Sequence, residues 1–265
     1  MSESPDGTDA SESDEHGPVK PFLEHLEDLR WVLVKVLSAV GLSWAACFSF
    51  SPFIMEFLQY PLKRSGVATD PSRFLTVFSP MEAFSISFQL ALYSGLVVAS
   101  PLVIYFIASY ALPALTGKER RLIAPAFWLG ALFFLAGVAF CYFVVLPPSL
   151  AVSVEFTRWL NLNVGFWTVE SYVSFVTKFM LGMGIAFEMP LVILVLVRYG
   201  VLNYAILSRT RRYAIVIIAI VSAVLTPPDV ASLLIMSLPL ILMYEACIWI
   251  AWLMEWKEKT TGSAS

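Results

Sequence analysis

The sequence predicts an all-α membrane protein built from six transmembrane helices. Of its 265 residues, 58% are hydrophobic and 14% are charged, whereas a soluble domain carries about 25% charged residues. Six long apolar runs divide the chain, and the basic residues gather in the segments on one side of them. A water-soluble globular domain is therefore excluded, because too few charges are available to cover its surface.

The six apolar runs are residues 32–50, 84–112, 122–146, 172–199, 213–225 and 230–254. A transmembrane helix needs about 20 mostly apolar residues, and the first four runs meet this length. The fifth run has 13 residues, and Glu245 interrupts the sixth after residues 230–244. We therefore expect helices five and six to be short, so that protein shields them or the bilayer thins around them.

Several residues mark where these helices begin or bend. Ser79 and Glu82 form a capping box around Pro80 at the first helical position, and Thr168 and Asp229 are expected to cap helices four and six. Prolines inside three of the runs are expected to kink them, at Pro101, Pro190 and Pro239. Small residues four positions apart permit close helix packing, at Ala91, Gly95 and Ala99.

The basic residues predict the orientation of the chain. Twelve of the 17 lysines and arginines lie near the N-terminus, in the second and fourth loops and at the C-terminus, against four on the other side. Since cytoplasmic loops are rich in Lys and Arg, we expect both termini in the cytoplasm. The six-span domain is expected at residues 20–255, between an acidic disordered tail at 1–19 and a short cytoplasmic tail at 256–265.

Acidic residues on the basic side are few. Residues 21–29 (PFLEHLEDL) predict a short amphipathic helix at the membrane interface, on which Glu24 and Asp28 lie four residues apart. Glu27 and Glu119 are further acids on this side. A solvated acidic face is one interpretation, and a docking site for a cationic partner is the other. For Glu119, a surface ion pair with a neighbouring arginine is a further alternative.

Two ionisable residues fall inside the fourth run. Glu188 lies near its middle beside Pro190, and Lys178 lies nearer its outer end. Ionisable groups within a membrane mark functional sites by default, although an acid that stabilises the kink and a lysine that extends to the surface are the alternatives. Ser174, four residues before Lys178, permits a hydrolase dyad, but no glycine pattern for an oxyanion hole accompanies it.

No metal or cofactor site is expected. The three cysteines are far apart and the two histidines, His16 and His25, give no metal-ligand spacing. The sequence has no Walker motif, dinucleotide fingerprint or nucleic-acid-binding patch. Residues 226–229 (TPPD) are explained by turn chemistry, because two prolines end a helix.

Six motifs in order give the sequence a resemblance to the TatC family, the core receptor subunits of the twin-arginine protein translocase. The motifs are HLEDLR (25–30), YPL (60–62), SPMEAF (79–84), PALTGKERR (113–121), FEMP (187–190) and LTPPD (225–229). The resemblance covers about residues 20–255. It implies a cup-shaped, non-enzymatic bundle in the plasma (inner) membrane of a prokaryote, which binds signal peptides with paired arginines and moves folded proteins across the membrane with the proton-motive force.

The resemblance also implies the site residues. The signal-binding acids of the family match Glu119 and Asp28, with Glu24 or Glu27 assisting; Tyr110 and Arg30 belong to the same motifs. Positions linked to structure or translocation match Pro61, Glu188 and Asp229. Helices five and six form the docking face for single-span TatA- and TatB-type partners, at Leu225, Thr226 and Leu233. Membrane lipid and further copies of the chain are the other implied partners.

The chemistry of such a ligand agrees with these positions. Each guanidinium of a paired-arginine signal can bind a carboxylate through two hydrogen bonds. The alternative is a proton-coupled secondary transporter with Glu188 and Lys178 as its midplane groups. That alternative predicts an internal repeat, and no repeat is visible in the sequence.

Overall fold

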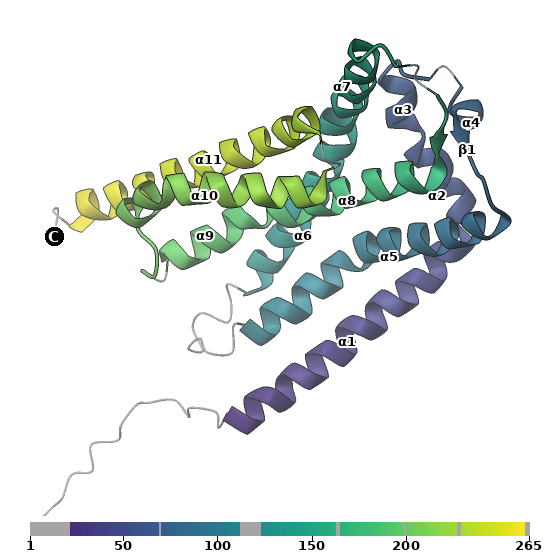
Figure 1. The fold of residues 1–265 in the computed structure, drawn as a ribbon. Helices are drawn as coiled ribbons and strands as arrows, with labels where there is room; N and C mark the ends of the chain where they lie inside the picture. Colours follow the sequence, from purple (N-terminus) through teal and green to yellow (C-terminus); the bar gives the residue numbers. More distant parts are fainter. Residues whose placement is uncertain are drawn as a thin grey trace, which may run out of the picture.

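The computed structural model describes residues 22–68, 70–111, 123–162, 165–198, 200–226 and 229–262. Helices make up most of these residues and spread apart toward the ends nearest the chain termini (Figure 1). α1 (Phe22–Ser49) and α11 (Val230–Gly262) lie on opposite sides of the molecule. α5 (Pro80–Ala111), α6 (Ile123–Phe140) and α8 (Val169–Phe187) lie between them. The predicted all-α class is confirmed.

The first helix is one continuous element of 28 residues. The separate interfacial helix that we predicted over residues 21–29 is therefore wrong. Between Pro21 and Gly41 the chain has neither glycine nor proline, so nothing ends the helix before its apolar part begins. Residues 22–29 are instead the first turns of α1, and the candidate membrane span begins within them, at Leu26.

The second helix starts where the sequence predicts. α5 begins at Pro80, and the Glu82 carboxylate accepts a hydrogen bond from the backbone N–H of Phe78 at 2.8 Å. Glu82 therefore caps the backbone N–H of Phe78, one residue before Ser79, the predicted partner in the capping box. α5 stays helical through Pro101 and ends at Ala111, next to residues 112–122, which lie outside the described parts.

Short elements connect α1 to α5, and the sequence did not predict them. They are α2 (Ser51–Leu58), α3 (Tyr60–Arg64), α4 (Pro71–Phe74) and β1 (Leu75–Thr76), which pairs in parallel with β2 (Trp167–Thr168). Two tyrosine hydroxyls anchor α2, since Tyr142 donates to the Phe57 carbonyl at 2.6 Å and Tyr172 to the Leu58 carbonyl at 2.5 Å. This connection therefore packs against the helices that follow.

The third span is longer than its predicted end at residue 146. α6 continues through a π-helical turn, η2 (Cys141–Val145), into α7 (Leu146–Trp159). Pro147 and Pro148 lie in the first turn of α7, where their missing N–H groups cost least. The prolines therefore begin a new helical segment and do not end the span.

The fourth span is broken at Glu188, between α8 and α9 (Met189–Arg198). The break follows from Pro190, whose ring and missing N–H disrupt the preceding turn, and the predicted kink is confirmed. Thr168 caps α8 as predicted, because its hydroxyl accepts from the Ser171 N–H at 3.2 Å.

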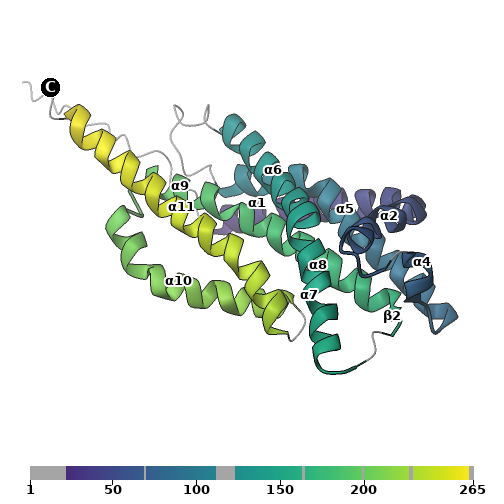
Figure 2. The ribbon, with the colours of Figure 1, turned by 90° about the horizontal axis from the view of Figure 1, so that it is seen from above.

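The last two helices, α10 (Tyr204–Leu225) and α11, lie side by side (Figure 2). α10 has a 13-residue apolar part after Arg212, as predicted, but α11 runs for 33 residues. The prediction of a short sixth helix is therefore wrong, because Glu245 stays within the helix and forms an ion pair with Arg211 at 3.0 Å. α11 also extends into the predicted tail, to Gly262.

Five helical stretches in the described parts are long and apolar enough to cross a membrane. They are Leu26–Ser49, Pro80–Tyr110, Trp128–Trp159, Val169–Arg198 and Val230–Trp256. α10 is not among them, because three arginines lie in its first half. Length and composition thus support five of the six predicted spans.

Candidate functional site

Acidic side chains occupy the first turns of α1. Glu27 is exposed, Asp28 is half-buried and Arg30 is exposed. The side chain of Glu24 and the whole of Glu119 lie outside the described residues. The structure therefore places Asp28 and Glu27 within the continuous helix α1 rather than on a separate surface segment.

The neighbour of α1 in this region is α5. α1 and α5 pack closely where Gly95 meets Trp44: a Cβ at Gly95 would lie 2.8 Å from the Trp44 backbone nitrogen. The neighbouring small residues Ala91 and Ala99 are fully buried, and the Phe88 ring lies 5.3 Å from the Trp44 ring. The predicted stripe of small residues is thus the α1 contact surface of α5.

This contact determines how far along the two helix axes the predicted signal-binding residues Asp28 and Tyr110 lie relative to each other. α1 and α5 are antiparallel (Figure 1), so the N-terminal part of α1 and the C-terminal part of α5 extend in the same direction from the contact between Gly95 and Trp44. At 1.5 Å per residue, Asp28 lies about 24 Å from it along α1 and Tyr110 about 22 Å along α5. The half-buried side chains of Asp28 and Tyr110 therefore lie at similar depth, at the ends of two packed helices.

A second polar group lies in the middle of the bundle. One oxygen of Glu188 is buried and has no hydrogen-bond partner among the described residues. The other lies 3.2 Å from the position that a Cβ at Gly130 would take, beside Ile104 of α5 and Leu191 of α9. Gly130 therefore makes room for a carboxyl group among three apolar helices.

Lys178, the other candidate midplane group, does not pair with this carboxyl group. Lys178 is exposed on α8, ten residues and about 15 Å along the helix from Glu188. No ion pair joins the two residues in the described parts of the chain. Lys178 therefore lies apart from the Glu188 carboxyl group.

Pro61 has a structural setting. It is fully buried in the first turn of α3, directly before the fully buried Leu62. Because α3 begins just after the carbonyls that Tyr142 and Tyr172 hold, Pro61 fixes the backbone at the anchored end of the first loop.

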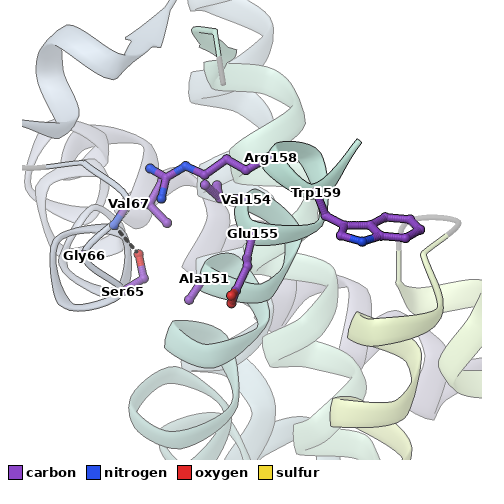
Figure 3. Close-up of a pocket in the computed structure, with 8 residues that line it drawn as sticks. All are labelled: Ser65, Gly66, Val67, Ala151, Val154, Glu155, Arg158 and Trp159. Carbon is purple, nitrogen blue, oxygen red and sulfur yellow. Dashed lines mark hydrogen bonds between the residues drawn. The ribbon is translucent and has the colours of Figure 1, made fainter. Parts of the chain in front are cut away.

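A cavity of about 600 Å³ lies between the turn after α3 and the end of α7. Figure 3 shows the Arg158 guanidinium reaching over Val67, and the Glu155 carboxylate pointing away from it. The Ser65 hydroxyl accepts from the Val67 N–H at 3.4 Å and thereby holds the turn. Sequence reasoning missed this cavity because about 90 residues separate its two walls. Its walls, α3 and α7, lie at the opposite end of the bundle from the first turns of α1 (Figure 1).

The predicted partner-docking residues lie where α10 meets α11. Leu225 lines an apolar groove of about 450 Å³ between α8, α10 and α11. Thr226 is buried, and its hydroxyl has no hydrogen-bond partner among the described residues; the same holds for Ser222 one turn earlier. Leu233 is half-buried in the first turn of α11. Asp229 caps that helix as predicted, accepting from the Ser232 N–H at 2.6 Å.

Comparison with known proteins decides the family. A family model described as Sec-independent protein translocase protein (TatC) matches residues 24–239. The chain belongs to the TatC family. Its relatives include the TatC protein of Aquifex aeolicus, which is 34% identical over 246 residues, covering 92% of this chain and 100% of that protein.

Other TatC proteins give the same result. That of Akkermansia muciniphila is 40% identical over 194 residues, which are 73% of this chain and 56% of that longer protein. The crystal structure of a twin-arginine translocase receptor, TatC, superposes with a TM-score of 0.77 at 34% identity, covering 86% of this chain and 98% of that one. The fold is therefore the TatC fold in its helical core.

Proposed function

We propose that this chain is the receptor subunit of a twin-arginine translocase and binds paired-arginine signal peptides at the end of the α1–α5 pair. One observation carries the assignment of the site: α1 and α5, packed through Gly95, hold Asp28 and Tyr110 at the same depth. The TatC motif that contains Glu119 follows α5 directly.

The ligand chemistry fits two carboxylates at a membrane surface. A guanidinium has five donors in a planar fork and binds a carboxylate through two of them. Asp28 receives one arginine of the signal and Glu119 the other, while Glu24 and Glu27 add negative charge nearby. Since the local dielectric constant falls near the lipid, these pairs are stronger there than in bulk water.

The partners of this subunit are single-span proteins of the TatA and TatB type. Their docking face is the apolar groove beside Leu225, where the exposed Ile217, Ile220 and Val224 offer an apolar stripe. Thr226 and Ser222 are buried near the end of α10, and their hydroxyls have no hydrogen-bond partner among the described residues. Leu233, in the first turn of α11, completes the proposed docking residues. Further copies of the chain complete the complex, and the proton-motive force drives transport of folded cargo.

The chain resides in the plasma (inner) membrane of a prokaryote, with both termini in the cytoplasm. The excess of arginine and lysine on the side of the termini supports this orientation. Glu188 acts in translocation, since a buried carboxyl oxygen without a hydrogen-bond partner among the described residues is costly to retain within a membrane.

Peptide binding by the purified full-length chain tests the proposal. A twin-arginine peptide should bind, and its twin-lysine counterpart should bind less tightly, because lysine lacks the planar fork. Asp28→Asn and Glu119→Gln should each weaken binding about tenfold. Glu56→Gln, which changes an exposed acid of α2, should leave binding unchanged. Equal binding of both peptides would refute the proposed recognition.

A further inference from the structure

A small groove of about 270 Å³ lies between the first half of α10 and the second half of α11. Its lining residues are Tyr204, Arg211, Ile248, Trp249 and Trp252. Tyr204 and Arg211 are seven residues apart on α10, and Trp249 and Trp252 are three apart on α11, so each pair shares one helix face. The signal-binding and partner-docking surfaces described above do not include these residues.

Arg211 is the charged residue of this lining. Its Nε lies 3.0 Å from a Glu245 oxygen. A guanidinium has four further N–H bonds on its terminal nitrogens, and the Arg211 side chain is 46% exposed. Glu245 therefore orients the guanidinium through one edge and leaves the terminal nitrogens accessible to another anion.

The carboxylates nearby are directed to other groups. Glu245 binds Arg211, and Glu255 accepts a hydrogen bond from the Tyr204 backbone N–H. Neither residue lines the groove. The groove therefore presents the Arg211 guanidinium to a ligand and has no lining carboxylate for an ammonium group.

The remaining walls are aromatic and apolar. Trp249 is 66% exposed and Trp252 is 44% exposed, whereas Ile248 beneath them is buried. Both tryptophans lie in the last third of the candidate span Val230–Trp256, and indole rings favour the headgroup level of a bilayer. A ligand that fits here has an anionic head and an apolar body.

We propose that this groove binds an anionic phospholipid from the leaflet on the side of the chain termini. Arg211 binds the lipid phosphate through its terminal nitrogens, and Trp249 and Trp252 pack against the glycerol and the upper acyl chains. An anionic headgroup is favoured over a zwitterionic one, because no carboxylate lines the groove to receive an ammonium. This site is independent of signal recognition.

Lipid retention by the purified full-length chain tests this site. The chain is incubated in detergent with phosphatidylglycerol or phosphatidylcholine, and bound lipid is counted by native mass spectrometry. Phosphatidylglycerol should bind about tenfold more tightly than phosphatidylcholine. Inorganic phosphate at equal concentration should not displace it, since phosphate lacks the apolar body. Displacement by phosphate, or equal binding of the two lipids, would overturn the proposal.

Three variants separate the groove from general surface charge. Arg211→Gln should remove the preference for phosphatidylglycerol, whereas Arg209→Gln, an exposed arginine on another face of the same helix, should keep it. Glu245→Gln breaks the ion pair but leaves Arg211, so phosphatidylglycerol should bind at least as tightly as before. If Arg209→Gln and Arg211→Gln reduce the preference equally, the groove is not the site.

Discussion

Replacing Gly95 by alanine probes the contact that positions the proposed signal site. The new Cβ would lie 2.8 Å from the Trp44 backbone nitrogen and 2.9 Å from its Cα. Carbon atoms in contact prefer about 3.5–4.0 Å, so α1 has to move away by more than about half an ångström. Because the clash is with backbone, no side-chain rotation relieves it.

The cost can be compared with a matched variant. Overpacking of this kind costs about 1–3 kcal/mol, while replacing a helical glycine by alanine returns up to about 1 kcal/mol. A Cβ added at Gly41 of α1 would meet no atom within 4 Å, so Gly41→Ala receives the gain alone. Gly95→Ala should therefore be about 1–3 kcal/mol less stable than Gly41→Ala.

Thermal unfolding of both variants in one detergent measures this difference. For a chain of this size, about 1 kcal/mol corresponds to a shift in Tm of about 2–4 °C, so Gly95→Ala should unfold roughly 2–12 °C below Gly41→Ala. Binding of a twin-arginine peptide should fall in Gly95→Ala only, since Asp28 moves relative to Tyr110. Equal Tm values for the two variants would show that α1 and α5 do not approach as closely as described.

Three further changes test other parts of the structure. Tyr172→Phe leaves the buried Leu58 carbonyl without its hydroxyl donor and should lower the unfolding free energy by about 1–3 kcal/mol, whereas the exposed Tyr213→Phe should not. Glu188→Gln keeps the volume of the side chain and should preserve the Tm while export of a twin-arginine reporter falls; unchanged export would contradict a role in translocation. At Asp70 the hydrogen bond from the Ser72 hydroxyl holds the carboxyl pKa below its ordinary value of 3.8. The cap of α4 should therefore persist above that value and be lost as the pH falls through the lower folded pKa, which the Ser72 amide shift reports in NMR.

Local signals in the sequence predicted the helix boundaries that depend on neighbouring residues. Thr168 and Asp229 cap their helices, and Pro190 breaks the fourth span. These outcomes follow from hydrogen-bond donors and ring geometry within one turn of each residue. The motifs likewise identified the family, because its residues recur in a fixed order along the chain.

Features that depend on distant contacts were not predictable in this way. The charge of Glu245 indicated the end of a span, but Arg211 from another helix pairs with it and the helix continues. The short elements after α1 are held by Tyr142 and Tyr172, which lie 85 and 114 residues away from their acceptors. Periodicity and composition carry no information on such pairs.

The packing makes α5 the link between the two proposed functional regions. α1 is the least buried candidate span, with 6% of its window buried against 28–50% in the others, and Gly95 of α5 supports it. Nine residues later, Ile104 of the same helix lies beside the Glu188 carboxyl group. A displacement of α1 should therefore reach Glu188 through α5. In that case the change in unfolding free energy of the double variant Gly95→Ala/Glu188→Gln should differ from the sum of the two single changes by more than about 0.5 kcal/mol. For residues without shared contacts, the two changes add to within that limit.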